Sequence, residues 1–309
     1  SQTADIGLLQ PATAIDSDQT DLIRCYEARM ISSFNHREGS AGITDKNTFR
    51  TGVSIAISDE ERTDPHFLAQ SRYWASPQDT AQRLPKDYPY QWLMGFKDVT
   101  SATNTRTMIA CVLPKTAVLC SIRVVFLEDY RDATPGGLLS LLANWNSFCF
   151  DFFCRQSTPG NHLSDYIVRQ LPTLPPSTYQ QPCPWDAVLT LEDWILPRVL
   201  ELTYTAWDLE GFAKDCGYEA APFPWNLDRR SWLQAELDAA FFHLYSIQRE
   251  DVDFMLESFP IVKRKDQQKL GCFQTKSRIL HIYDWLTTAI QSGSAYHRNL
   301  EASMKDHFP

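Results

Sequence analysis

The stretch LLSLLANWNSFCFDFFCRQSTPGNHLSDYIVRQLPTLPP, residues 138–176, decides how this chain is organised. Its apolar run, 138–153, predicts a buried helix that leads into a short polar turn at 157–162. A second amphipathic run, 163–171, predicts a shorter helix or a strand. Prolines at 172, 175, 176, 182 and 184 then argue against regular helix and predict a linker or an irregular crossover. The stretch therefore separates two parts of different character.

The part before it alternates short apolar segments with turn residues. Residues 52–58 alternate and are rich in β-branched side chains, so we expect a strand there. Residues 90–96, 107–112 and 118–126 have a similar character, and 22–34 could be an extended segment or a short helix. Few βαβ units are evident. Residues 1–184 are therefore expected to form a mixed-sheet α/β domain.

The part after it has helical periodicity. The favourable core AELDAAF lies inside one of these segments. The expected helical segments are 186–216 with a break near Pro197, a helix capped by Asn226 or Asp228 that runs to about Tyr245, then 250–258 and 276–290. Residues 185–309 are therefore predicted to be a mainly helical C-terminal domain. The chain as a whole is predicted to be α+β.

The bulk composition favours a globular cytoplasmic protein. Hydrophobic residues make up 43% and charged residues 22% of the sequence. No apolar run approaches the ~18 residues of a membrane-spanning helix. No secretory signal is recognisable, and the start SQTADIGLLQ is typical of the interior of a longer protein. Eight cysteines lie scattered without a CxxC pair, which favours reduced thiols over disulfides or zinc.

The net charge of −9 argues against a strongly basic protein that coats DNA. A local basic face can still attract phosphates, because the electrostatic contribution depends on the charges at the contact. Composition alone therefore leaves DNA binding open.

Four groups of polar residues are candidates for DNA contacts. Arginine can form bidentate bonds to guanine or phosphate, and asparagine and glutamine can do so to adenine. For each group the alternative interpretation is a solvated surface or loop. The groups are Arg29, His36 and Arg37 in YEARMISSFNHREG; Arg106 and Lys115 around the segment TNTRT; Arg155, Gln156, Asn161, His162 and Arg169; and Lys263, Arg264 and Lys265 in the basic run 261–278.

Catalytic motifs are poorly represented. The sequence contains no glycine-rich phosphate loop, no nucleophile elbow and no deaminase pattern. Its closest approach to the adenine-methyltransferase motif [DNS]PP[YF] is Asp87-Tyr88-Pro89-Tyr90, where Tyr88 replaces the first proline. His36 has no partner at ligand spacing, so a metal site is not expected. We predict no catalytic residue and no metal ligand in this chain.

Six ordered blocks, taken together, resemble one family. They are YEARMISSFNHR (26–37), RYW (72–74), WLMGFKDVTSATNTRTMIACVLPKTAV (92–118), LLANWNSFCFDFFCRQSTPGNHLSDYIVRQLPTLPP (141–176), LPRVLELTYTAWDLEGFAKDCGY (196–218) and RSWLQAELDAAFFHLYSIQREDVDFMLESFPIVKRKD (230–266). The chain resembles the C-terminal target-recognition region of large N6-adenine DNA methyltransferases. That group includes single-chain type II restriction–modification enzymes and phage-defence methyltransferases. The resemblance covers roughly residues 20–290.

The resemblance implies a module that recognises double-stranded DNA beside a catalytic domain. That methyltransferase domain would lie before Ser1 in the parent polypeptide and would bind S-adenosylmethionine, so no cofactor is expected in this chain. The hypothesis predicts a basic concave face, built from Arg29, Arg37, Arg106, Lys115, Arg155 and Arg169. The alternative is a protein-interaction or assembly module of a phage-defence complex without base readout. It predicts a large exposed apolar or acidic surface instead.

Overall fold

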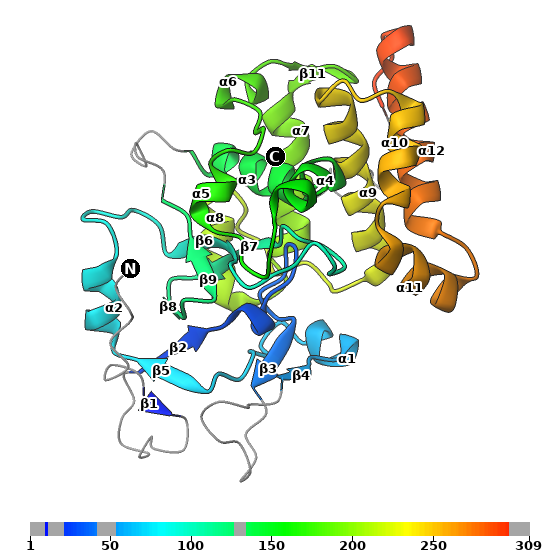
Figure 1. Cartoon of the computed structure of the whole chain (residues 1–309). Coiled ribbons are helices and arrows are strands. Elements are labelled where there is room, and N and C mark those ends of the chain that lie inside the picture. Colours follow the sequence, from blue (N-terminus) through cyan, green and yellow to red (C-terminus); the bar gives the residue numbers. More distant parts are fainter. Residues whose placement is uncertain (1–9, 12–21, 42–53, 127–133, 297–309) are drawn as a thin grey trace.

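The computed structural model describes residues 10–11, 22–41, 54–126 and 134–296 (Figure 1). Short strands dominate the first part of the described chain and helices dominate the rest, which confirms the predicted α+β class. Figure 1 shows the blue and cyan N-terminal elements on one side and the yellow-to-red helices on another, with green helices between them. Residues 52 and 53 of the strand expected at 52–58 lie outside the described residues.

The elements before residue 127 are short. In chain order they are β1 (Gln10–Pro11), β2 (Ile23–Tyr26), the 3-10 helix η3 (Ala28–Met30), β3 (Gly39–Ala41), β4 (Ser54–Ala56), α1 (Asp59–Thr63), β5 (Tyr73–Ala75), α2 (Pro77–Arg83), β6 (Trp92–Lys97), β7 (Ala110–Pro114), β8 (Ala117–Val118) and β9 (Ile122–Val124). The segment expected at 22–34 thus contains both a strand and a short helix. The described strands pair as β1-β5-β2-β8, as the hairpin β3-β4 and as β7-β6-β9.

The three-stranded sheet β7-β6-β9 is antiparallel and has a core on each face. Trp92 lies opposite Pro114 and Phe96 lies opposite Ala110, so facing residues share a side of the sheet. One face packs against the helices and the other packs against the N-terminal elements. The helix-side residues are Trp92, Met94, Phe96, Ala110 and Val112, and the opposite residues are Leu93, Cys111, Leu113 and Ile122.

The elements after residue 134 are mainly helical. They are α3 (Pro135–Asn146), α4 (Phe148–Ser157), α5 (Asp165–Val168), α6 (Pro176–Tyr179), β10 (Pro182–Cys183), β11 (Asp186–Thr190), α7 (Leu191–Thr203), η4 (Trp207–Leu209), α8 (Glu210–Asp215), α9 (Leu227–Leu244), α10 (Arg249–Glu257), α11 (Pro260–Leu270) and α12 (Gln274–Ser292). The predicted Asn226 cap of α9 is confirmed, because its side chain accepts a hydrogen bond from Arg229 N at 3.0 Å. At the position of helix α11 the sequence predicts only a basic run and no helix.

The prediction of a single helix at 138–153 is wrong, because the chain forms two helices that meet at Ser147. This residue is extended, with φ −72° and ψ 149°, and its side chain caps α4 by accepting from Phe150 N. The Asn146 side chain bonds both Ala110 N and Ala110 O, at 3.0 and 2.9 Å. Pairing with β7 therefore competes with helix continuation. One consequence is that Arg155 and Gln156 belong to the last turn of α4 rather than to the polar turn.

The linker and Pro197 also differ from expectation. Short helix α6 begins at Pro176, a position that tolerates proline, and β10 pairs with β11. Pro197 lies inside α7 without ending it. The helix packs against α3 and α9, and Arg198 Nη1 donates to Trp194 O at 2.7 Å. Tertiary packing thus outweighs the local cost of this proline.

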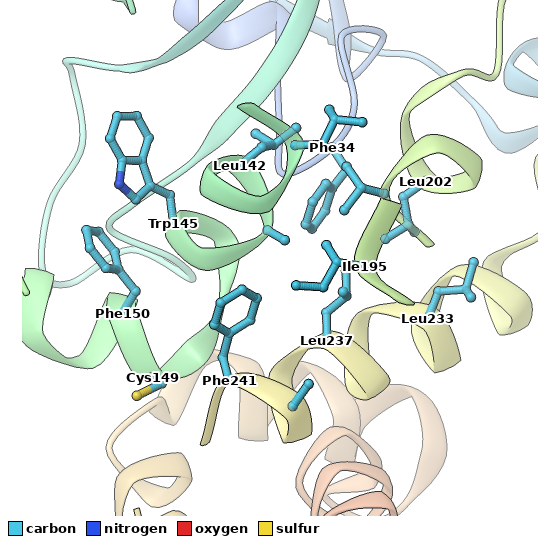
Figure 2. Close-up of a cluster of buried hydrophobic side chains, with 14 of the residues drawn as sticks. Phe34, Leu142, Trp145, Cys149, Phe150, Ile195, Leu202, Leu233, Leu237 and Phe241 are labelled. Carbon is cyan, nitrogen blue, oxygen red and sulfur yellow. The ribbon is translucent and has the colours of Figure 1, made fainter. Parts of the chain in front are cut away.

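One hydrophobic core crosses the predicted boundary at 184/185. Figure 2 shows Phe34 from the N-terminal part meeting Leu142 of α3, Ile195 of α7 and Leu237 of α9. The cluster includes residues from Phe34 to Tyr296. The predicted boundary therefore marks a change in sequence character, whereas the two parts of the chain share one hydrophobic core. Among helices of the described residues, none has the length and apolar character required to cross a bilayer.

Candidate nucleic-acid interface

The buried carboxylate of Asp151 connects α4 to the segment that follows β6. Asp151 is fully buried in α4 and accepts hydrogen bonds from Thr107 N and Met108 N at 2.9 and 2.7 Å. Arg106 Nε donates to the same carboxylate at 3.0 Å. Two sequence regions that were each predicted to contact DNA therefore lie side by side.

Arg106 and Arg155 stabilise this junction from inside. Their side chains are only 15% and 9% exposed. Arg106 Nη2 donates to Asn146 O at 2.5 Å, and Arg155 Nη2 donates to the carbonyls of Asn104 and Thr105 at 2.6 and 2.8 Å. Burial lowers the pKa of Arg155, while neighbouring Asp151 raises it. These guanidinium groups shape the loop rather than extend from it.

The polar turn pairs with the end of β6 through several contacts. Thr100 N donates to Asn161 O at 3.1 Å, and Leu163 N donates to Asp98 O at 2.7 Å. The buried Asp98 carboxylate binds His162 Nδ1 at 2.9 Å and Arg123 Nε at 3.1 Å. The His162 and Arg123 side chains remain 68% and 46% exposed. Arg123 was not among the predicted candidates, although its place between Ile122 and Val124 in a strand-like segment was the available signal.

Helix α11 completes this surface. Lys265 Nζ donates to Thr105 Oγ1 at 3.2 Å, which places α11 against the loop after β6. Lys265 and the neighbouring Arg264 are exposed. We call the resulting surface the polar seam; its exposed members are Thr103, Asn104, Arg123, Gln156, Asn161, His162, Arg264 and Lys265.

The candidates from the first sequence block lie elsewhere. Arg37 is fully buried, and its guanidinium donates to the carbonyls of Arg62, Asp64, Phe67 and Thr205 at 2.8–3.1 Å. His36 is also buried, with Nε2 2.9 Å from Asp208 Oδ1. Arg29 is exposed and paired with Glu27 at 3.1 Å. Arg37 and His36 are therefore scaffold residues in this structure.

The remaining candidates do not complete the expected basic face. Lys115 follows β7 beside Trp92, at the end of the sheet opposite Lys97 and Arg106. Arg169 is exposed at the end of α5, and Lys263 pairs with Glu257 at 2.7 Å. The basic face predicted from six cations is therefore wrong in its composition. Arg37 is buried, the side chains of Arg106 and Arg155 are mostly buried, and Lys115 lies at the far end of the sheet. The six predicted residues were Arg29, Arg37, Arg106, Lys115, Arg155 and Arg169.

A cleft of about 720 Å³ adjoins the polar seam. It lies between the segment before β3, the end of β6, the junction of α3 with α4, and helices α9, α11 and α12. Its charged lining residues are Glu38, Lys97, Arg106, Asp228, Asp238, Lys265, Asp266, Lys269 and Arg278. The sequence analysis missed Lys97 and Asp238 because each lies in an otherwise buried pattern.

Asp238 is the most strongly perturbed acid of this cleft. It is 5% exposed and accepts a hydrogen bond from Phe148 N at 2.7 Å. Burial raises its pKa to about 7, and Asp151 adds to the rise while Arg106 opposes it. The group therefore titrates near neutral pH inside the molecule.

Across the described ranges, no three His, Cys, Asp or Glu residues gather where they could hold a metal ion. The eight cysteines are unpaired. Burial raises the pKa of Cys149 and Cys154 to about 12, so these thiols are protonated at neutral pH.

Comparisons with protein-family models, with curated proteins and with solved structures give no match. The geometry of the polar seam and the sequence resemblance described above are therefore the two observations that bear on function.

Proposed function

We propose that this chain recognises double-stranded DNA through the polar seam. We further propose that it is the non-catalytic part of an S-adenosylmethionine-dependent N6-adenine methyltransferase or restriction–modification enzyme of the cytoplasm. The main observation in favour of DNA recognition is that the loop after β6, the end of α4 and helix α11 contact one another. Arg155 and Lys265 make these connections, through Asn104 O and Thr105.

The seam combines two kinds of group that DNA recognition needs. Asn104, Gln156 and Asn161 are exposed amides, and such amides can bond the N6 and N7 positions of adenine. Arg123, His162 and Lys265 supply donors suited to phosphate oxygens, which fix the register of a protein on the duplex. The seam therefore contains both base-reading and phosphate-positioning groups.

The buried support explains how the seam keeps its shape. Asp151, Arg106 and Arg155 hold the loop with hydrogen bonds that are withdrawn from solvent. Asp98 does the same for His162 and Arg123. A site whose side chains are held by surrounding hydrogen bonds loses less freedom on binding.

The methyl-transfer part of the proposal depends on the resemblance of the six sequence blocks. The cofactor and the catalytic motif would belong to an N-terminal domain of the parent polypeptide, and that domain would be the partner of this chain. This chain would hold the DNA register and read bases near the modified adenine.

Selection of bound duplexes from a random library tests base readout. The Gln156→Ala/Asn161→Ala double variant should lose adenine preference at one or two positions, since a bidentate amide–adenine pair contributes about 1–3 kcal/mol of discrimination. The exposed amide variant Gln181→Ala, near α6, serves as the control. An unchanged preference in the double variant, or no selection by the wild type, would overturn the proposal.

A further inference from the structure

Lys97, the last residue of β6, lines the cleft. Within the described residues its Nζ has no hydrogen bond and no ion pair. The side chain is partly buried, and this burial lowers its pKa although Glu38 raises it at longer range. An amine that has no counter-ion in a partly closed cleft attracts anions, so Lys97 points to a ligand that supplies the negative charge.

The carboxylates of the cleft are already engaged by other groups. Their partners are Arg62 for Glu38 at 3.2 Å, Arg278 for Asp228 at 2.5 Å, Thr275 N for Asp266 at 2.6 Å and Phe148 N for Asp238 at 2.7 Å. Lys269 also lines the cleft and, in the described part of the chain, has no carboxylate partner. Arg62 and Arg278 neutralise Glu38 and Asp228, whereas Asp238 and Asp266 accept only main-chain N–H groups. Against these two acids the cleft has Lys97, Lys265 and Lys269, so its lining retains an excess of positive charge.

The rest of the lining suits a ligand with an apolar body. Phe34, Ile109, Leu237 and Val262 supply apolar surface. Ser32, Ser33 and Gln234 supply hydrogen-bonding groups. The volume of about 720 Å³ lies within the range of small-molecule sites, roughly 300–1,000 Å³.

We propose that this cleft binds a small phosphorylated molecule with an aromatic or apolar body, of the mononucleotide class. Its phosphate would contact Lys97 and its body would lie against the apolar lining. A lysine amine binds phosphate as a compact point charge. This inference goes beyond DNA recognition, because the ligand enters the cleft beside the seam and binds without a duplex.

Calorimetric titration of the whole chain tests the site with adenosine 5′-monophosphate, adenosine and inorganic phosphate. The monophosphate should bind saturably and more tightly than either of the other two. Lys97→Met keeps the apolar stem and should weaken its binding about tenfold or more, as loss of a hydrogen bond to a charged group does. Lys115→Met is the matched control, because this lysine lies at the opposite end of the sheet.

In the calorimetric titrations, three results would overturn the proposal. They are no saturable binding of the monophosphate, equal binding of the monophosphate and inorganic phosphate, and an unchanged affinity in a folded Lys97→Met variant.

Arg264→Ala separates the two sites, since Arg264 belongs to the seam and does not line the cleft. It should weaken duplex binding without changing the affinity for the monophosphate. If Lys97→Met instead weakens duplex binding as much as monophosphate binding, Lys97 belongs to the DNA surface and the proposal fails.

Discussion

The arginines around Asp151 and the lysines of the neighbouring cleft carry the same charge but differ in whether the fold supplies their hydrogen-bond acceptors. Arg106 donates to the buried Asp151 carboxylate and Arg155 forms an ion pair with it, and both donate to main-chain carbonyls. Lys97 and Lys269 line the cleft without a carboxylate partner among the described residues. Because their acceptors lie inside the fold, Arg106 and Arg155 support the loop, whereas the cleft lysines can still bind a ligand.

Removing the buried carboxylate should have the largest effect. Asp151→Ala leaves Thr107 N, Met108 N and two guanidinium groups without their acceptor. Breaking such a buried pair costs about 3–5 kcal/mol, so the free energy of unfolding should fall by that amount in urea denaturation. The exposed variant Asp165→Ala, in α5, should change it by less than about 0.5 kcal/mol. Equal stability of the two variants would contradict the structural role of Asp151.

Arg37 should behave as a scaffold residue. Arg37→Met leaves the carbonyls of Arg62, Asp64, Phe67 and Thr205 without this donor and should cost about 3 kcal/mol of unfolding free energy. Arg29→Met, at an exposed pair with Glu27, should cost less than about 1 kcal/mol. Thermal denaturation measures both. If Arg37→Met leaves stability intact and weakens duplex binding, the sequence-based assignment of Arg37 to the DNA contact is right after all.

Asp238 should make the protein less stable as the pH rises. Its pKa is raised to about 7 in the folded protein, so the folded state keeps the proton to higher pH than the unfolded state. The stability that protonated Asp238 contributes is therefore fully present below about pH 4 and is lost as the pH rises through 7. Asp238→Asn can still accept from Phe148 N and should stabilise the protein by on the order of 2 kcal/mol at pH 8, but hardly at pH 4. Denaturation at both pH values checks this, and an equal effect at each would contradict it.

Local pattern predicted most helices of the tail and the main strands, but it predicted helix at 186–190, where β11 forms, and it did not predict α11. The Asn226 cap and the apolar periodicity around AELDAAF are properties of neighbouring residues, so they can be recognised without the fold. The end of the first helix at Ser147 cannot, because Asn146 bonds Ala110, which is 36 positions away. The same holds for Arg37, whose acceptors come from residues 62–67 and from Thr205. Whether a charge faces inward is decided by such distant partners.

Lys115 should give the smallest effect. It was a candidate for DNA contact, yet it lies at the end of β7 away from the seam. Lys115→Ala should change stability by less than about 0.5 kcal/mol and leave duplex affinity unchanged in fluorescence anisotropy. Lys214→Ala, on α8 and paired with Glu210, provides the comparison for loss of a surface charge. A loss of affinity with Lys115→Ala alone would extend the DNA surface to the far end of the sheet.

The salt dependence of duplex binding tests the central claim most directly. The Arg264→Ala/Lys265→Ala double variant and the Arg37→Met variant should be titrated in parallel with the wild type over a series of salt concentrations. For the double variant we predict that the slope of log affinity against log salt decreases by about 0.9 for each phosphate that the protein no longer neutralises. Folded Arg37→Met protein should keep the wild-type slope. The opposite pattern, with the slope reduced by Arg37→Met and unchanged in the double variant, would contradict the assignment of the polar seam as the DNA-binding surface.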